Sequence, residues 1–241
     1  MQTQTATADR AHREGLPGVL GREIVDGRLP PGQVLTLDKL QDRFGISRTT
    51  ARDGVKVLES LGLLYSKRRV GLVVNTPGRW NVYAPSVIAW RLDSSQARRA
   101  YVELTHLRVA VEPEAVALAA EHRTQQQADR LQELAGTMRR LGVAGRLEEF
   151  MLADVDFHRL LLEASGNSMF SALAGVVGEV LTGRTEHGLM PARPVDEALA
   201  AHEAVADAVA QNNPAEARHH MQLLVDEVRS ALTDSPVTLG E

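Results

Sequence analysis

The stretch DVDFHRLLLEASGN (residues 154–167) predicts an amphipathic helix whose apolar face carries two polar residues. On a helical period of 3.6 residues, Asp154 and His158 interrupt a stripe of apolar residues made of Leu147, Phe150, Met151, Phe157 and Leu161. Side chains four residues apart on a helix are neighbours, so this carboxylate and this imidazole can coordinate the same ion. Both groups suit Zn²⁺ and similar divalent metals.

Two other predicted helices also turn a polar side chain inward. Arg108 and His202 each interrupt an apolar stripe in their own segment. A buried guanidinium needs a partner, because desolvating an unpaired charge is costly, and its planar donors pair well with a carboxylate. We therefore expect Arg108, Asp154, His158 and His202 to line a pocket for a small anionic effector.

His220 is a further candidate for this pocket. It lies on the inner face of the last predicted helix, whereas His219 points away. His202 and His220 could not meet on one straight helix, because 18 residues rise about 27 Å. The break at 212–214 allows an antiparallel return. A single inward histidine is more often a hydrogen-bonded core residue than a ligand, and that alternative stays open.

The N-terminal segment predicts a helix-turn-helix. A first helix is expected over residues 16–26. Thr36 can cap a second helix that Gly45 ends, and Ser47 can cap a third helix that is followed by Gly62. Two short helices joined by a tight turn that contains a glycine make a helix-turn-helix.

The third of these helices separates charge from core. Its apolar residues share one arc, and the opposite face carries Arg48, Thr49, Arg52 and Lys56. Two β-prone runs follow and predict a hairpin, or wing, with three basic residues between them, Lys67, Arg68 and Arg69. A basic face on a lone helix is often only a solvated surface. Here its place in a helix-turn-helix favours double-stranded DNA, with arginines at guanine edges and the wing at phosphates.

Three stretches carry a resemblance to a known family. IVDGRLPPGQVL, LQDRFGISRTTARDGVKVLESLGLL and RRVGLVV, within residues 16–75, resemble the GntR family of bacterial transcription regulators. The resemblance implies operator contacts from Arg43, Arg48, Thr50 and Arg52. It also implies that Gly71 shapes the tip of the wing. Gly54 departs from the family pattern, and a glycine inside a helix costs about 1 kcal/mol relative to alanine.

Beyond residue 95 no strand pattern is found, and an all-helical bundle is expected. About six helices are predicted, over 96–122, 124–141, 146–164, 168–185, 194–211 and 214–232. Caps or breakers separate them at Thr124, Gly142, Gly145, Gly166, Asn167, Pro191, Pro194 and Pro214. The predicted fold is mainly α, with a disordered N-terminus (1–15), a winged helix-turn-helix (16–75), a linker (76–95), a helical effector domain (96–232) and a tail (233–241). We expect the linker to pack Trp80 and Trp90 against a domain surface.

The C-terminal part also resembles a known domain. LRVAVEPEAVALAA, DVDFHRLLLEASGN and AHEAVADAVAQNNPAEARHHM resemble the FCD ligand-binding domain of the FadR subfamily. In metal-binding members an Asp and a His one turn apart are joined by two further histidines, which matches Asp154, His158 and His202. The last histidine falls at Leu224, a departure. Either His220 replaces it, or three residues bind the metal and the effector adds an oxygen, or these residues bind a polar ligand without metal.

The predicted linker, RWNVYAPSVIAWRL, resembles that of the galactonate-operon repressor branch of this subfamily. The resemblance favours a sugar acid such as galactonate as effector over fatty acyl, amino-acid or dicarboxylate compounds. The leading hypothesis is therefore a homodimeric repressor that leaves a palindromic operator when the sugar acid binds. A metal sensor using the same pocket is an alternative. A metal-dependent enzyme is not expected, because no general base or oxyanion donor stands beside the metal candidates.

Composition sets further limits. The chain has 241 residues and no cysteine, which excludes disulfides, thiolate metal sites and a thiol nucleophile. Residues 1–78 hold 12 Lys and Arg against 8 Asp and Glu, whereas residues 79–241 hold 15 against 23. A basic segment joined to an acidic one suggests two domains with different partners. The start lacks the apolar core of a signal peptide and no apolar run approaches about 18 residues, so a cytoplasmic protein is expected.

Overall fold

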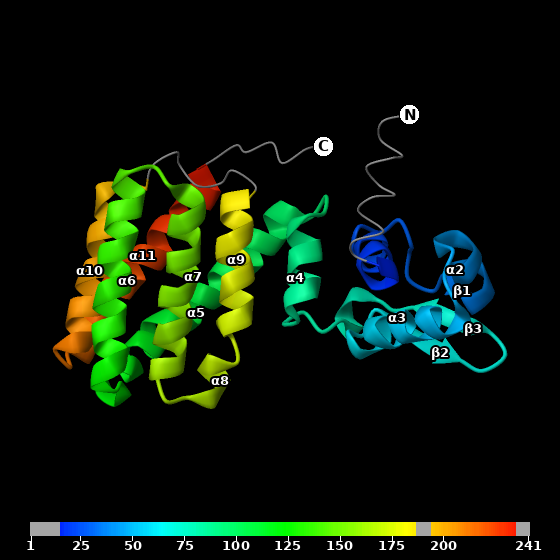
Figure 1. Ribbon diagram of the computed structural model, residues 1–241, viewed down its shortest axis with the longest axis horizontal. Coiled ribbons are helices and arrows are strands. Elements are labelled where there is room, and N and C mark those ends of the chain that lie inside the picture. Colours follow the sequence, from blue (N-terminus) through cyan, green and yellow to red (C-terminus); the bar gives the residue numbers. More distant parts are fainter. Residues whose placement is uncertain (1–14, 187–193, 235–241) are drawn as a thin grey trace. The chain divides into compact units, whose positions relative to one another are not determined.

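A computed structural model describes residues 15–186 and 194–234 of the chain (Figure 1). The disordered stretch predicted at the N-terminus, the break at Pro191 and most of the predicted tail lie outside the described residues. The chain divides between Ala97 and Arg98 into two compact units. None of the helices in the described residues is long and apolar enough to cross a membrane.

The N-terminal unit is a winged helix-turn-helix, as predicted. Residues 15–25 are helical. The other elements are β1 (Val34–Leu35), α2 (Leu37–Phe44), α3 (Arg48–Ser60), β2 (Leu64–Lys67) and β3 (Gly71–Val74). The three strands form an antiparallel sheet in the order β1-β3-β2, with Leu64 opposite Val74 and Lys67 opposite Gly71. The β2–β3 hairpin is the wing.

Local side chains fix the turn between α2 and α3. The Thr36 hydroxyl accepts a hydrogen bond from the backbone N–H of Lys39, and Ser47 does the same for Thr50. Gly45 ends α2 in the left-handed conformation, at φ 63°. These are the caps predicted from the sequence, and they set where the second helix of the motif begins.

The segment expected to be a linker holds regular structure. It contains a short 3₁₀ helix, η1 (Pro77–Arg79), and the two-turn helix α4 (Pro85–Leu92). Val87 is fully buried, and the Trp90 ring lies so close to Gly21 that a Cβ there would sit 2.3 Å from it. This segment therefore packs into the core of the N-terminal unit. Eight residues with four buried positions are too few and too apolar to show a helical period.

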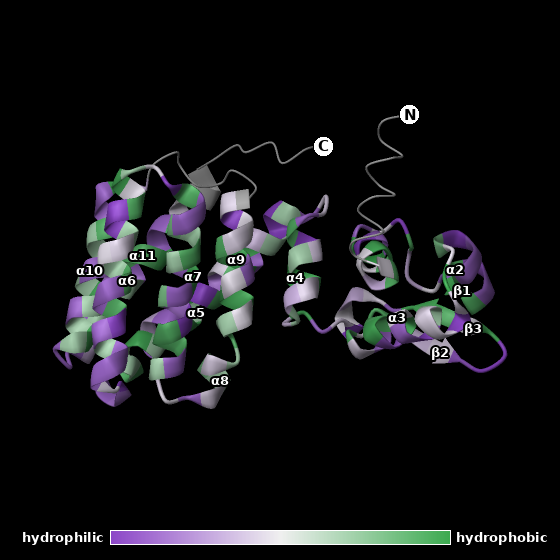
Figure 2. Cartoon of the chain, in the orientation of Figure 1, coloured by the Kyte–Doolittle hydropathy of each residue, from purple (hydrophilic) through white to green (hydrophobic). Residues whose placement is uncertain are grey.

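The C-terminal unit is all-helical, as predicted. Its helices are α5 (Ala97–His122), α6 (Gln125–Val143), α7 (Leu147–Ala164), α8 (Ser168–Ser171), α9 (Ala174–Glu186), α10 (Asp196–Ala210) and α11 (Pro214–Asp234). Most of them carry hydrophobic residues on one face and hydrophilic residues on the other (Figure 2). The apolar faces of α5, α6, α7, α10 and α11 build the main core, which includes Phe150, Phe157, Leu199, Val205 and Met221.

Two helix boundaries differ from the prediction. The helix expected over 168–185 is divided into α8 and α9, because a tight turn with the N–H of Leu173 bonded to the carbonyl of Phe170 ends α8. Gly142, expected to break the chain, continues α6 and is buried. A Cβ on Gly142 would lie 3.0 Å from Leu199, so this glycine permits the close approach of α6 and α10.

Candidate functional site

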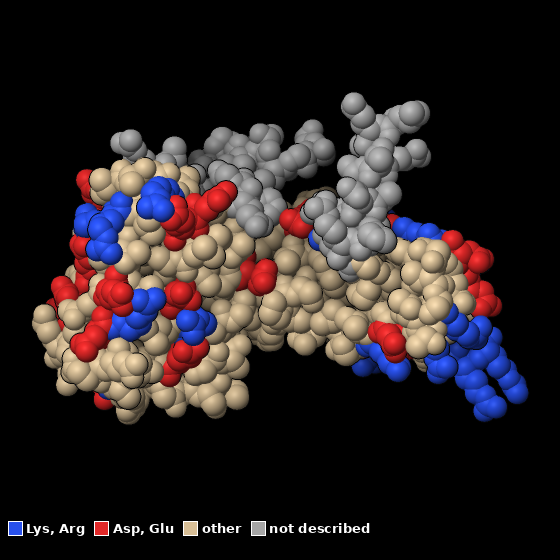
Figure 3. Space-filling view, in the orientation of Figure 1, with Lys and Arg blue, Asp and Glu red and all other residues tan. Residues whose placement is uncertain are grey.

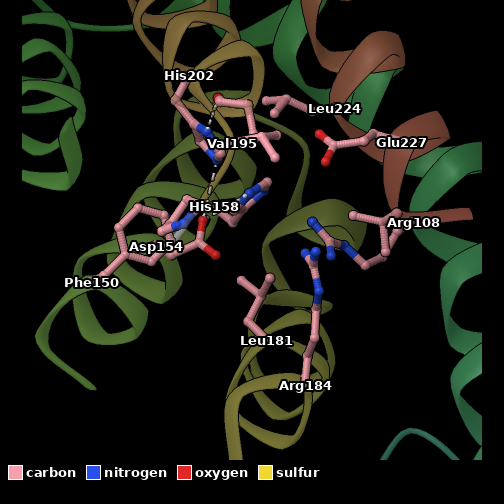
Figure 4. Close-up of a pocket in the computed structure, with 13 residues that line it drawn as sticks. Arg108, Phe150, Asp154, His158, Leu181, Arg184, Val195, His202, Leu224 and Glu227 are labelled. Carbon is pink, nitrogen blue, oxygen red and sulfur yellow. Dashed lines mark hydrogen bonds and ion pairs between the residues drawn. The ribbon is translucent and has the colours of Figure 1, made fainter. Parts of the chain in front are cut away.

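A pocket in the C-terminal unit gathers polar residues from several helices (Figure 4). The four side chains predicted to converge all line it, namely Arg108 of α5, Asp154 and His158 of α7 and His202 of α10. All four are buried. The cavity of this pocket measures about 40 Å³, which is room for an ion or a water molecule. The remaining wall is mostly apolar, from residues of α7, α9, α10 and α11.

Asp154, His158 and His202 form a group that could hold a metal ion. Asp154 Oδ1 lies 3.4 Å from His158 Nε2 and 3.3 Å from His202 Nε2. These separations exceed those of good hydrogen bonds. They match the spacing of ligand atoms around tetrahedral Zn²⁺, which is about 3.3–3.4 Å for bonds of about 2.0–2.1 Å. Asp154 Oδ1 is buried and has no hydrogen-bond partner among the described residues.

Neighbouring groups turn both imidazoles toward Asp154. His202 Nδ1 lies 2.7 Å from the carbonyl oxygen of Ala198 and can donate to it, which leaves Nε2 as a lone pair directed at Asp154. His158 Nδ1 lies 2.9 Å from Glu112 Oε2. That contact has the distance of an ion pair without hydrogen-bond geometry, so of the two histidines His202 shows the second N–H contact to a carbonyl that is usual for metal-binding histidines. A lone pair facing a carboxylate oxygen is favourable only with a cation between them, so this donor set fits a divalent metal.

Arg108 already has an internal partner. Its Nε lies 2.6 Å from Glu112 Oε1 and its Nη2 lies 3.2 Å from Glu112 Oε2, with both side chains less than 5% exposed. The third guanidinium nitrogen, Nη1, is buried and has no hydrogen-bond partner among the described residues. Sequence reasoning predicted that Arg108 needs a partner but missed Glu112. The signal was its place one turn further along the same helix.

The buried ionisable groups of the pocket shift one another's pKa values. Burial alone would raise the pKa of Glu112, but the charges of Arg108 and His158 lower the pKa to about 2. Burial alone would lower the pKa of His158, but Glu112 and Asp154 raise the pKa to about 9. The pKa of Asp154 lies well below its usual value, because the two imidazoles outweigh its burial. A proton on His158 or a metal ion can therefore supply the cation beside Asp154.

Arg184 is a pocket residue that sequence reasoning missed. It comes from α9 and points toward Arg108 (Figure 4). Burial and the nearby charge of Arg108 lower the pKa of Arg184. The sequence did hold a signal, because Val177, Leu181 and Arg184 follow a helical i, i+4, i+7 spacing and the first two are buried.

The fourth metal candidate, His220, lies outside the pocket. Leu224, which occupies the position where a fourth ligand was expected, is buried and lines the pocket. His220 does not line it. Its Nε2 lies 3.4 Å from Glu216 Oε2 on the same helix, with the side chain 29% exposed. The structure therefore brings together three of the four candidate ligands.

The predicted DNA-contacting residues lie on the surface of the N-terminal unit. Exposed side chains are Arg43, Arg48, Thr49, Thr50, Arg52 and Lys56 from α2 and α3, and Lys67, Arg68 and Arg69 from the wing. The opposite face of α3 is buried through Ala51, Gly54, Val55 and Leu58. Lys and Arg side chains gather at the wing in the space-filling view (Figure 3). The face predicted to meet DNA is thus accessible to it.

Several of these basic residues have acidic neighbours. Arg43 makes a bidentate ion pair with Glu23, whose side chain is only 13% exposed. Arg48 lies 3.1 Å from Asp38, and both side chains are exposed. No described residue forms an ion pair with Arg52. Arg43 therefore also holds α2 to the helix over 15–25, whereas Arg52 is free to contact a base.

The tip of the wing differs in detail from the expectation. The left-handed residue of the loop is Arg69, at φ 63°, whereas Gly71 is the first residue of β3, at φ 123°. A Cβ on Gly71 would lie 2.6 Å from the carbonyl oxygen of Leu35. Gly71 is therefore required by the close approach of β1.

Comparison with known proteins matches both units. The model of bacterial regulatory proteins of the gntR family matches residues 18–74, and the FCD domain model matches residues 103–227. The chain is 27% identical over 197 residues to the uncharacterized HTH-type transcriptional regulator YieP of Escherichia coli K12, covering 80% of this chain and 84% of YieP. It is 26% identical over 200 residues to a probable D-xylose utilization operon transcriptional repressor of Paenarthrobacter nicotinovorans, covering 82% of this chain and 78% of the relative.

Solved structures share the fold. Lar, which controls the expression of the Listeria monocytogenes agr system, superposes with a TM-score of 0.60 at 18% identity. The match covers 90% of this chain and 94% of Lar. At this level of identity the likeness concerns the fold alone.

Proposed function

The chain belongs to the GntR family of bacterial transcription regulators and carries an FCD domain, and from this premise we propose that it represses a sugar-acid catabolic operon. In this proposal a small carboxylate effector binds the C-terminal pocket and lowers the affinity for the operator. The observation that carries the proposal is the pocket itself, where buried charged groups from separate helices converge on one cavity. Such convergent polar groups are typical of ligand sites.

The N-terminal unit would read the operator through α3. Its exposed residues Arg48, Thr49 and Arg52 would lie in the major groove, with the wing residues on phosphates. A homodimer would place two such units on the half-sites of a palindrome. Since DNA lies in the bacterial cytoplasm, the regulator would act there.

The C-terminal pocket would take the effector beside Asp154, His158 and His202. A divalent metal such as Zn²⁺, held by these three residues, would provide a Lewis-acidic anchor for an oxygen of the effector. Leu224, which lines the pocket, offers no ligand atom, so the effector oxygen would complete the coordination. The resemblance of the linker to the galactonate-operon repressor branch favours galactonate among sugar acids, and the relative named for D-xylose utilization is also a regulator of sugar catabolism.

Release from DNA requires that the effector prefer a state that binds the operator poorly. An effector with equal affinity for both states would shift nothing. The test is to select an operator from genomic DNA and then measure its fluorescence anisotropy with the protein while sugar acids are added, with and without a chelator. We expect galactonate or a close relative to release the operator. Failure of every sugar acid, with and without metal, would contradict the proposal.

A metal sensor is the second candidate, favoured by the spacing of the Asp154, His158 and His202 ligand atoms. In that case the ion itself would be the signal. The same titration separates the two functions, because a metal sensor would change its operator affinity with metal at a constant concentration of sugar acid.

A further inference from the structure

The two arginines of the pocket have different surroundings. Arg108 is held by Glu112 through two hydrogen bonds, so its charge is balanced within the protein. Arg184 lines the same pocket, and no residue in the described part of the chain forms a hydrogen bond or an ion pair with it. Arg184 is therefore the pocket arginine that has no ion-pair partner among the described residues.

An unanswered cation at this position is costly. Arg184 is partly buried, and desolvation and the charge of Arg108 lower its pKa more than the attraction of Asp154 and Glu227 raises it. Glu227 also lines the pocket, but it is exposed to solvent, where an ionic attraction is weak. A protein that keeps an arginine under these conditions gains from a ligand that brings the missing negative charge.

A second, separate observation points to the same ligand. Arg108 Nη1 is buried and lacks an acceptor, although the rest of that guanidinium is fully engaged. In Figure 4 the guanidinium groups of Arg108 and Arg184 point toward each other from α5 and α9. The guanidinium N–H groups of Arg184 and of Arg108 Nη1, which lack acceptors among the described residues, therefore face the same part of the pocket.

We infer that Arg184, together with Nη1 of Arg108, binds the anionic group of the effector, a carboxylate in the case of a sugar acid. This inference rests on the proposed function of the pocket as the effector site. It moves the recognition of charge from Arg108, where the sequence placed it, to Arg184. The hydroxyl groups of the sugar acid then lie toward Asp154, His158 and His202. A neutral sugar of the same length would lack the group that Arg184 binds.

The first test uses an anion that does not depend on the identity of the effector. Sulfate is titrated against the full-length protein at constant ionic strength, set with chloride, and the melting temperature is followed. Wild type and the control Arg130→Gln, which removes an exposed arginine paired with Glu133, should show saturable stabilisation by sulfate. Arg184→Gln should bind sulfate about 10- to 100-fold more weakly, as expected for loss of charged hydrogen bonds.

The same variants separate recognition from a structural role. If Arg184 only supported the fold, Arg184→Gln would lower the melting temperature of the ligand-free protein. We expect that melting temperature to rise, because an unanswered buried charge has been removed. Wild-type protein without saturable sulfate binding would overturn the inference. So would an Arg184→Gln variant that binds sulfate as wild type does.

The second test compares galactonate with its neutral counterpart galactitol by calorimetry. Wild type should bind galactonate and discriminate against galactitol, and Arg184→Gln should lose that discrimination. Equal discrimination in both proteins would contradict the role of Arg184 while leaving the effector pocket intact. Conversely, sulfate binding that depends on Arg184, without release of operator by any sugar acid, would contradict the proposed function and leave the anion site in place.

Discussion

Among single residues, five buried side chains form one continuous ionic chain through the pocket. Arg108 pairs with Glu112, Glu112 lies beside His158, and Asp154 lies between His158 and His202. Arg108 and His158 favour the ionised form of Glu112, and Glu112 and Asp154 favour the protonated form of His158. Removal of one member leaves a buried charge unbalanced, which costs more than the pair contributes when intact.

Glu112→Gln should therefore be strongly destabilising. The substitution leaves the charges of Arg108 and His158 without their counter-charge, and the free energy of unfolding should fall by about 3–5 kcal/mol, measured by urea denaturation. The control is Glu114→Gln, also on α5, which removes an exposed carboxylate paired with Arg218 of α11 and should cost less than about 1 kcal/mol. Equal losses in the two variants would show that Glu112 is not the centre of a buried network.

The pH dependence of the metal-free protein follows from the same shifts. The pKa of His158 is raised to about 9, so its stabilising contribution is fully present below its ordinary pKa of about 6.5 and is lost as the pH rises toward 9. The pKa of Glu112 is lowered to about 2, so its contribution is present above about 4.5 and is lost as the pH falls toward 2. Urea unfolding with chelator should show stability declining between pH 6.5 and 9, and a His158→Gln variant should lack this decline.

Residue patterns predicted part of this site. Asp154, His158 and His202 were predictable because each interrupts an apolar stripe, and burying a polar side chain is costly unless it has a partner or a ligand. Glu112 was not predicted, because a glutamate four residues from an arginine on a helix is usually part of a solvated surface pair. Arg184 was not found, because it lies at the end of its helix, where an arginine is ordinarily solvated.

At the scale of elements, the two arginines near the turn of the helix-turn-helix have separable roles. Arg52→Ala should weaken operator binding by about 5- to 100-fold, the effect of losing a good base contact, and should leave the melting temperature unchanged. Arg43→Ala should lower the melting temperature as well, because it breaks the bidentate pair with Glu23. Anisotropy and thermal unfolding on the same samples distinguish the two. Unchanged operator affinity and sequence preference in Arg52→Ala would show that α3 is not the recognition helix.

The contact between α4 and the helix over residues 15–25 makes a second prediction for an element. Gly21→Ala places a methyl group 2.3 Å from the Trp90 ring, so the helices must separate. The expected cost is about 1–3 kcal/mol in the unfolding of the N-terminal unit. The same substitution in a Trp90→Leu background should cost less, because the smaller side chain leaves room. If the free-energy losses of Gly21→Ala and Trp90→Leu were additive, the two residues would not be in contact.

Elements with local signals were predictable and those without were not. The caps at Thr36 and Ser47 and the glycine at 45 placed α2 and α3 because they act on adjacent backbone groups. α4 was missed because it is short and mostly buried, and its position depends on a tertiary contact with Gly21. The division between α8 and α9 rests on a turn that holds neither glycine nor proline.

At the scale of the whole molecule, the two parts of the chain carry opposite net charge, as expected for two units with different partners. The first 78 residues carry a basic excess and the remainder an acidic one, and the structure assigns the basic excess to the helix-turn-helix and wing. A basic surface attracts the phosphates of DNA whatever the base sequence. In the helical unit, by contrast, Arg108 and Arg184 line a pocket. Operator and effector would therefore compete through the conformation of the protein, since each has its own unit.

This arrangement predicts reciprocal coupling. If galactonate lowers operator affinity by some factor, the operator must lower galactonate affinity by the same factor, typically about 5- to 150-fold. Calorimetric titration of galactonate into free protein and into protein saturated with operator measures one side, and anisotropy measures the other. Arg52→Ala supplies the control, because at an operator concentration that saturates wild type but leaves this weaker-binding variant mostly free it should bind galactonate as the free wild-type protein does. Galactonate affinity that is unchanged by saturating operator would mean that the acid does not act through the DNA-binding state.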